Sequence, residues 1–498
     1  MKRRASGVLL HPTSLPGPYG IGDVGPGARG FLQWLDAAGQ RIWQVLPLNP
    51  VDHAGCPYAS PSAFASEPLL LSIDDLVDDR LLRSAEKPYA PDRAGRVDWA
   101  GVRARKGAAL RLAADRLRTE VDLRAWAQTQ PELATWATYK ALADELGAPW
   151  PVWPEALRDR APDALAAAAD RLAGPIEREL ALQWLFDRQW DRLRTEAKGR
   201  GIALWGDVPI FVGLACADPW SAPWRWRLDG DRRPVVVSGV PPDAFSVDGQ
   251  LWGHPLYDEE AHRREGFTWW IARMRRVLTQ VDRVRIDHFR GFEAVWEVAA
   301  HATDARGGRW IPGPGRPLLD ALRAAFGDPR TGEMPFVAED LGVITDDVKA
   351  LRDAYHLPGM VILQFAFNGD ALDRGRHDHG YLPHNHRPHQ VCYTGTHDND
   401  TALGWYRGTD EGTRGHVREY LAASDDDQPW ALVRAALRSV CDTVVVPIQD
   451  LLGKGSEARV NVPGRVDGNW SWRMDDEPLS LSLAGRVAHE VLLSGRSR

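Results

Sequence analysis

The chain of 498 residues is 44% hydrophobic and 26% charged, a composition typical of a folded globular protein, which excludes a disordered one. Its formal net charge of -7 leaves no basic surplus to neutralise phosphates, so we expect no nucleic-acid and no membrane partner. We find no run of about 18 apolar residues that would cross a membrane. The apolar stretch near the start is too short for a signal peptide, and four widely separated cysteines form no CxxC pair. We therefore expect a cytoplasmic protein with reduced thiols rather than a disulfide framework or a zinc site.

Eight short apolar or β-branched runs follow one another along the chain, and most end in polar residues. They are residues 5–11, 41–48, 202–211, 282–289, 335–340, 360–365, 391–400 and 443–452. Near-continuous apolar runs are typical of parallel strands that are covered on both faces. Helical patterns separate several of them, with Gly39 and Thr345 as expected helix caps. The alternation predicts an α/β fold, a (β/α)8 TIM barrel with its reactive groups at the carboxyl ends of the strands.

A barrel core takes about 250 residues, so about half of this single catalytic domain, residues 1–498, should be insertion. Residues 49–201 follow the second strand and are expected to form a mainly helical insertion, because residues 97–200 are rich in Ala, Leu, Arg and Glu. Residues 212–281 follow the third strand and are expected to form a loop or lid insertion, because residues 212–258 are rich in Gly, Pro and Trp. A last helix near 476–494 should close the barrel, with no C-terminal β-domain.

Acidic residues stand at three of the predicted strand ends: Asp287, Glu339 and Asp398, on the fourth, fifth and seventh strands. A barrel brings these ends to one mouth, where a carboxylate cluster is costly because like charges raise one another's pKa. Glycoside cleavage uses such a cluster, with one carboxylate as nucleophile and a protonated one as acid. Arg285 shares a strand face with Asp287 and could keep it charged, whereas Glu339 would need a raised pKa to act as the acid.

Two other interpretations stay open on these residues alone. An aspartate at a strand end is often a helix cap or an ion-pair partner, although three acids at separate strand ends weaken that interpretation. Clusters of Asp and His also bind metals, and one loop carries five histidines: His377, His379, His384, His386 and His389. Their spacing fits no standard zinc template, so we expect a solvated loop with one or two substrate contacts and no metal.

Tryptophan is abundant, with 22 residues against 10 Tyr and 12 Phe. We expect about half of these indoles to pack in the core. The others are candidates for stacking on sugar rings, since an indole face suits the C–H face of a sugar while its N–H finds a polar partner.

The motifs "VRIDHFRG", "VAEDLG" and "TGTHDNDT" resemble the active-site motifs of the amylomaltases, that is, the 4-α-glucanotransferases or disproportionating enzymes among the α-amylase-like barrels. The likeness continues along nearly the whole chain through "GVLLHPTSLPGPYGIGD", "WQVLPLNP", "PYASPSAFA", "GDVPIFV" and "GVPPDAFSVDGQLWGHPLYD". It implies retaining transfer of α-1,4-glucan segments through a covalent glucosyl-enzyme, without a cofactor. The expected partners are maltooligosaccharides, amylose, starch or glycogen, and the expected assembly is a monomer or small homo-oligomer.

The resemblance also implies roles for single residues. Asp287 would be the nucleophile, Glu339 the acid/base and Asp398 the transition-state stabiliser. Eight more residues would contact substrate: Tyr58, Ser60, Asp207, Gln250, Trp252, Arg285, His288 and His397. The chain departs from the family's usual residues at several positions, which leaves subsite details, chain-length preference and cyclisation open: Glu67, Ala244, His254 and Arg465. Two rivals remain, a hydrolase with the same acids and a catalytically idle glucan-binding protein, although the intact acid set disfavours the second.

Overall fold

The computed structural model describes residues 4–90, 95–242, 247–367, 379–465, 467–474 and 479–497. Its main sheet has eight strands, all paired in parallel, in the order β10-β11-β12-β1-β2-β3-β6-β9. The strands are β1 (Ala5–Leu9), β2 (Ile42–Gln44), β3 (Ala203–Val208), β6 (Arg283–Ile286), β9 (Phe336–Ala338), β10 (Gly359–Ile362), β11 (Gln390–Tyr393) and β12 (Thr443–Pro447). The amide of Ala338 donates to the carbonyl of Pro358 at 2.9 Å, which joins the two edge strands. The predicted (β/α)8 barrel is confirmed: each strand coincides with one of the eight runs, although β10 and β11 begin one residue before theirs.

Alternation along each strand divides the core into two parts. Val284 and Ile286 of β6 belong to the large cluster between barrel and helices, so Arg285 between them faces the barrel interior. The interior is filled by a separate cluster of ten buried residues: Leu9, Ile42, Leu46, Trp205, Val337, Met360, Ile362, Val391, Tyr393 and Val445. Apolar side chains thus fill the interior of the barrel, and polar side chains such as Arg285 lie toward the carboxyl ends of the strands.

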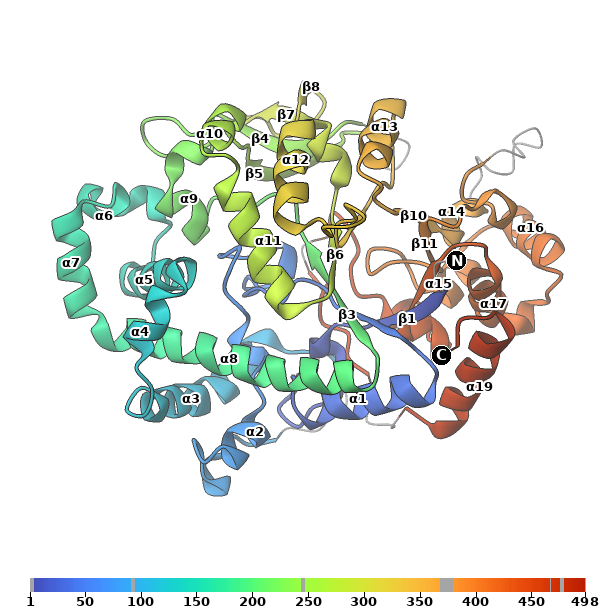
Figure 1. Ribbon diagram of the computed structural model, residues 1–498, viewed down its shortest axis with the longest axis horizontal. Helices are drawn as coiled ribbons and strands as arrows, with labels where there is room; N and C mark the ends of the chain where they lie inside the picture. The colour runs from blue at the N-terminus through green and yellow to red at the C-terminus, as the bar shows by residue number, and fades with distance from the viewer. Residues whose placement is uncertain are drawn as a thin grey trace.

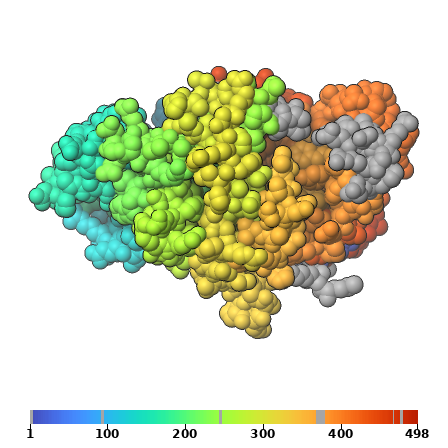
Figure 2. Space-filling model, turned by 90° about the horizontal axis from the view of Figure 1, so that it is seen from above, coloured from blue at the N-terminus to red at the C-terminus, as the bar shows by residue number. Residues whose placement is uncertain are grey.

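Helices form a lobe between β2 and β3. They are α2 (Ile73–Asp78), α3 (Trp99–Leu117), α4 (Leu123–Gln128), α5 (Pro131–Leu146), α6 (Glu155–Arg158), α7 (Pro162–Arg171) and α8 (Ala173–Gly199). The long helix α8 runs across this lobe in Figure 1, with α2 and α3 below it, and Figure 2 shows the lobe at one end of the molecule. Phe186, Trp190 and Leu193 of α8 are buried at helical spacing, and the Trp190 indole N–H donates to the carbonyl of Gln280 at 2.7 Å. These contacts fasten the lobe to the barrel.

The segment between β3 and β6 differs from the expected loop over residues 212–281. It contains α9 (Ala217–Ser221), β4 (Val236–Val240), β5 (Gln250–Pro255), α10 (Glu259–Arg264) and α11 (Thr268–Gln280). Strand β4 pairs antiparallel with β5 and with β7 (Ala294–Ala299), and β7 pairs with β8 (Arg309–Pro312). The resulting sheet, β5-β4-β7-β8, lies at the top of Figure 1. The loop prediction was wrong because the β4–β5 hairpin is completed by β7, which follows β6 in sequence, so part of the pairing is not local.

Helices cover the rest of the barrel. They are α1 (Pro26–Ala37), α12 (Gly315–Phe326), α13 (Asp346–Ala354), α14 (Leu363–Ala366), α15 (Ala402–Gly408), α16 (Glu411–Leu421), α17 (Trp430–Arg438), α18 (Ile448–Leu451) and α19 (Leu481–Leu493). Thr345 caps α13 as predicted, and Gly39 adopts the left-handed φ of +68° just beyond α1. In Figure 1 the two chain ends lie near each other, and the Arg496 guanidinium donates to the Ala5 carbonyl at 2.9 Å. No strand follows β12 in the described part of the chain, and none of the helices described there is long and apolar enough to span a membrane.

Candidate active site

Two of the three acids are fixed by the barrel sheet itself. Asp287 and Glu339 directly follow β6 and β9. The Asp287 amide donates to the Val208 carbonyl at 3.0 Å, and the Glu339 amide donates to the Ile286 carbonyl at 3.0 Å. Sheet hydrogen bonding therefore continues one residue past each strand and holds the two carboxyl groups side by side at the barrel mouth.

A buried guanidinium links Asp287 to one more carboxylate at this mouth. Arg285 lies 2.7 Å from Asp207 and 2.9 Å from Asp287, and the Tyr58 hydroxyl donates to the same Asp207 oxygen at 2.8 Å. The Arg285 side chain is 4% exposed and the Asp207 side chain 0%. Charges this deep are tolerated only when they are paired and hydrogen-bonded, so Asp207, Arg285 and Tyr58 form a rigid support beneath Asp287.

Glu339 is held by backbone amides rather than by a cation. Its two carboxyl oxygens accept from the His288 amide at 2.6 Å and the Leu341 amide at 2.8 Å. His288 has a φ of +52°, in the left-handed region, and this turn aims its amide at Glu339. Such a conformation costs a non-glycine residue about 1 kcal/mol or more and is characteristic of functional sites.

The surroundings favour the protonated form of both acids. Burial raises the pKa of both Asp287 and Glu339, and Arg285 opposes the rise in each case. The charges of Asp207, Glu339 and Asp398 raise the pKa of Asp287 further. Two carboxyl groups that interact this strongly titrate as a pair. The pair can therefore hold one negative charge and one proton together, as a nucleophile with a neighbouring acid requires.

Asp398 comes from the loop after β11 and is the most open of the three acids. Its side chain is 40% exposed, whereas that of His397 is 5% exposed. One Asp398 oxygen accepts from the Asn461 side-chain amide at 2.6 Å, and the other lies 3.4 Å from His397 Nε2. The Arg459 guanidinium donates to the Asp398 carbonyl at 2.7 Å. Sequence reasoning missed Asn461 and Arg459, because neither stands at a strand end.

Aromatic rings line the mouth on the Asp398 side. Tyr58 and His397 stack with ring centroids 5.2 Å apart and planes 12° apart. Trp470 lies 5.6 Å from Tyr58 and 5.9 Å from His397. Burial lowers the pKa of His397, so its ring is neutral at neutral pH. Sequence reasoning also missed Trp470, which lies in the segment "GNWSWR".

The second sheet reaches the mouth through β5. The Trp252 indole contacts the His288 ring edge-on, with centroids 4.7 Å apart, and donates to the Gln250 side-chain oxygen at 3.2 Å. Burial and Arg290 lower the pKa of His288 to about 3, so this ring is also neutral. Gln250, Trp252 and His288, which the sequence predicted at the site, therefore stand together on one rim.

Ser60, which was predicted to contact substrate, forms its hydrogen bonds with a residue close to it in sequence. Its hydroxyl donates to the Ser62 carbonyl at 2.8 Å and accepts from the Ser62 amide at 3.2 Å, which closes a turn near Tyr58. Of the departures from the family pattern, Glu67 is buried and caps a short helix through the Leu69 amide. Ala244 and His377 lie outside the described residues.

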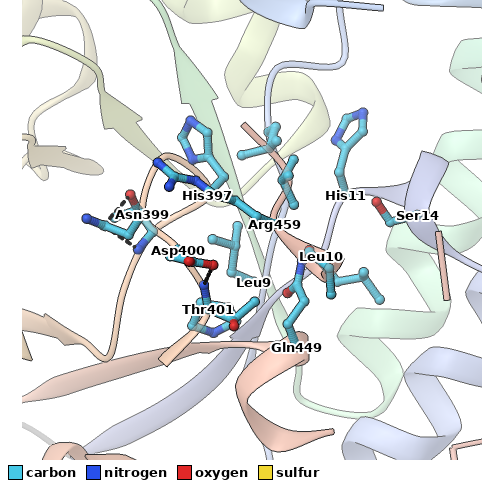
Figure 3. Close-up of a pocket in the computed structure, with 15 residues that line it drawn as sticks. Leu9, Leu10, His11, Ser14, His397, Asn399, Asp400, Thr401, Gln449 and Arg459 are labelled. Atoms are coloured by element: carbon cyan, nitrogen blue, oxygen red, sulfur yellow. Dashed lines mark hydrogen bonds between the residues drawn. The ribbon is translucent and has the colours of Figure 1, made fainter. Parts of the chain in front are cut away.

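A small cavity of about 30 Å³ lies behind His397. His11, Gln449 and Arg459 are among its lining residues, and Figure 3 shows these side chains around the Asp398 loop. Asn399 accepts from the Thr396 amide at 2.9 Å, so the loop closes on itself. The cavity has room for about one water molecule, and it supports the loop without being large enough for a sugar.

Most of the tryptophans are structural. Of the 22 indoles, 14 are buried in the core: Trp34, Trp43, Trp99, Trp136, Trp150, Trp153, Trp190, Trp205, Trp220, Trp226, Trp269, Trp270, Trp430 and Trp472. Core packing therefore takes more than the expected half. Trp252 and Trp470 are the two that the contacts above bring to the mouth.

A barrel with buried, interacting carboxylates at its strand ends defines an enzyme that uses acid–base and nucleophilic carboxylate chemistry. The sequence profile of the 4-alpha-glucanotransferases matches residues 10–480. A 4-alpha-glucanotransferase of Thermus thermophilus is 45% identical over 500 residues, which cover 97% of this chain and 97% of that protein. The chloroplastic or amyloplastic 4-alpha-glucanotransferase of Solanum tuberosum is 43% identical over 486 residues, which cover 95% of this chain and 82% of that protein.

Among solved structures, an amylomaltase from Streptococcus agalactiae in complex with acarbose matches with a TM-score of 0.93 and 31% sequence identity, over 100% of both chains. The chain belongs to the 4-alpha-glucanotransferase family. The resemblance that the motifs around Asp287, Glu339 and Asp398 indicated is confirmed.

Proposed function

We propose that this enzyme transfers α-1,4-glucan segments from one maltooligosaccharide or starch chain to the 4-hydroxyl of another glucan or of glucose. The observation that carries the proposal is the pairing of Asp287 and Glu339 at adjacent strand ends, with Arg285 bonded to Asp287. Two interacting carboxyl groups at one mouth suit a retaining displacement, in which one attacks and the other moves a proton.

In the first half of the reaction Asp287 attacks the anomeric carbon of the donor glucan. Glu339 gives its proton to the departing glycosidic oxygen, and a covalent β-glucosyl-enzyme forms. Glu339 can carry that proton while keeping both backbone contacts, because each carboxyl oxygen has a second lone pair. Arg285 favours the charged form of Asp287 before the attack.

In the second half an acceptor glucan replaces the leaving chain. Glu339 removes the proton of its 4-hydroxyl, the oxygen attacks the anomeric carbon, and Asp287 leaves as a carboxylate. Two inversions restore the α-configuration. Asp398 would stabilise the oxocarbenium-like charge and hold sugar hydroxyls, with its position maintained by the Asn461 amide.

Transfer exceeds hydrolysis only if the acceptor sugar displaces water from the mouth. Trp252 and Gln250, on the rim beside His288, are placed to bind an acceptor ring and exclude solvent, as a lid would. On the opposite side, Tyr58 and His397 present stacked rings, and we assign them, with Asp207 and Arg285, to the subsite that holds the reacting sugar. Ser60 is proposed as a neighbouring subsite contact.

Incubation with maltotriose tests this function. A transferase converts maltotriose to glucose and longer maltooligosaccharides while the total of reducing ends stays constant, whereas a hydrolase raises that total. We expect Asp287→Asn to abolish turnover and to retain the circular dichroism and melting temperature of the folded protein. A rise in reducing ends that matches substrate consumption would favour a hydrolase, and inactivity of the unmodified enzyme would favour a binding protein.

We further propose a cytoplasmic location and a monomer or small homo-oligomer. The four cysteines support the first, because all are free thiols, three of them buried. The net charge of -7 supports the expectation of no nucleic-acid partner. Light scattering of the purified enzyme measures the assembly, and a species larger than a tetramer would contradict it.

A further inference from the structure

A second group of reactive side chains lies away from the acids, on the outer face of the barrel. It consists of His386, Cys392 of β11 and Cys441, which stands two residues before β12. Their ligand atoms all lie within 4.8 Å of one another. His386 is 6% exposed and both cysteines are 0% exposed. Among the residues that the structure describes, this is the one such group with potential metal ligands.

The His386 ring is oriented as a metal-binding histidine would be. Its Nε2 lies 2.9 Å from the Tyr381 carbonyl, and because a carbonyl only accepts, Nε2 carries the ring proton. Nδ1 is left with a free lone pair, is buried, and has no hydrogen-bond partner. Metal-binding histidines almost always donate their other ring N–H to a carbonyl or carboxylate in this way.

A cation lies beside the two cysteines. The guanidinium of Arg496 donates to the Cys441 carbonyl at 2.8 Å and interacts electrostatically with both sulfur atoms. A neighbouring cation stabilises a thiolate, which is the form that binds metal. The Ser439 hydroxyl is buried as well, and it lies within hydrogen-bonding reach of the Cys441 and Cys392 thiols.

We propose that His386 Nδ1, Cys392 Sγ and Cys441 Sγ bind a zinc ion, with the Ser439 hydroxyl or a water molecule as the fourth ligand. Two thiolates and an imidazole are a donor set that selects zinc over harder divalent ions. Zinc bonds of about 2.3 Å to sulfur and about 2.0 Å to nitrogen place ligands roughly 3.5 to 3.8 Å apart. The ligand atoms, which lie within 4.8 Å of one another, therefore have to approach by about 1.3 Å at most. Binding releases two thiol protons to solvent.

The site would be structural and would connect to the active site through Tyr381. Burial raises the pKa of the Tyr381 phenol, and the charges of Asp340 and Glu339 raise it further. The Tyr381 ring lies 5.5 Å from Phe365. A zinc ion on His386 would fix the turn that runs from Tyr381 to His386 against β11. The main expected effect of losing zinc is therefore a lower melting temperature, and the expected effect on turnover is smaller.

The test is the metal content of the full-length, untagged enzyme purified without chelators. Mass spectrometry of the elements should find about one zinc per chain. His386→Ala and Cys441→Ser should lose most of it. The matched control is His384→Ala, from the same histidine run, whose ring Nδ1 lies 2.7 Å from the Tyr420 hydroxyl; this variant should keep its zinc.

Cobalt provides a readout that does not depend on how the variants fold. Cobalt(II) added to the metal-free wild-type enzyme should produce the near-ultraviolet absorption of thiolate-to-cobalt charge transfer, and alkylation of the thiols should abolish it. The proposal is overturned if the wild-type enzyme contains no zinc and shows no cobalt band. It is also overturned if copper(I) fills the site, or if Cys392 and Cys441 form a disulfide in the native protein. None of these readouts depends on glucan transfer.

Discussion

Replacement of Arg285 by Gln should move the pH dependence of the reaction. The guanidinium lies 2.9 Å from Asp287 and opposes the rise in the pKa of that carboxyl. At 2.9 Å and an effective dielectric constant of about 20, the attraction is about 6 kcal/mol before desolvation is subtracted. The net effect of an adjacent cation on a carboxyl is about one to three pKa units, or about 1.4 to 4 kcal/mol.

Loss of Arg285 therefore raises the pKa of Asp287 further. Because the proposed attack requires Asp287 to be charged, the acidic limb of the kcat/KM profile for maltotriose should move up by about one to three pH units. Below the new pKa, activity should fall about tenfold for each unit of that shift. The matched control is Arg283→Gln, on the same face of β6, where the guanidinium lies over the Trp205 ring at 5.5 Å. An unchanged acidic limb in Arg285→Gln would refute the reasoning.

The same variant should lose stability in a pH-dependent way. The buried Asp207 and the partly buried Asp287 lose their shared cation, which costs about 3–5 kcal/mol of unfolding free energy at neutral pH. In the variant, Asp287 has a folded-state pKa above its unfolded value. The loss of unfolding free energy caused by Asp287 is therefore complete when the pH is above the folded-state pKa. It becomes smaller as the pH falls through the folded-state pKa toward the pKa of Asp287 in the unfolded chain. The difference in melting temperature between wild type and variant should narrow as the pH is lowered, and a constant difference would contradict the assignment.

Three further substitutions test single contacts. Asn461→Ala removes the amide that donates to Asp398 at 2.6 Å. A hydrogen bond to a charged group contributes about 1.5–3 kcal/mol, so kcat/KM for maltotriose should fall by about one to two orders of magnitude, while the melting temperature stays unchanged. Tyr58→Phe keeps the ring but removes the donor to Asp207; kcat/KM should fall by about tenfold, and an unchanged value would remove the hydroxyl from the mechanism. Trp190→Ala empties a core site of 2% exposure and should cost about 3–5 kcal/mol in urea unfolding, with glucan transfer at low temperature retained.

The main features of the barrel could be read from local patterns. Each of the eight runs is apolar because its strand is covered on both faces. Successive side chains of such a strand are all buried, so the run of apolar residues can be recognised in the local sequence. The acids at positions 287 and 339 follow their strands directly. Parallel strands in a barrel end at one mouth, so knowing where each strand ends was enough to expect Asp287 and Glu339 together.

Contacts made by residues away from the strand ends could not be read in this way. Asn461 contacts Asp398 although 63 positions separate the two residues in sequence. Strand β4 forms by pairing with β5 and with β7, and β7 comes after β6 in the chain. Composition described residues 212–258 as a loop because glycine and proline punctuate them, whereas hydrogen bonds to distant partners decide their conformation. Arg290, which the sequence left without a role, binds the Val343 carbonyl and lies over the Trp310 ring.

The division between sequence and tertiary structure is clearest at the cysteines. Their spacing excluded every standard zinc template, since Cys392 and Cys441 are far apart in the chain and the histidines fall in a loop of their own. The sequence by itself determined the barrel, its family and the three acids, because those depend on strand order and on long local motifs. Only the tertiary structure decided that His386, Cys392 and Cys441 meet, and that the second sheet carries Trp252 to the mouth. Contacts of this kind depend on how loops fold back over the barrel. Burial of side chains and pairing with residues distant in sequence determine the conformation of those loops.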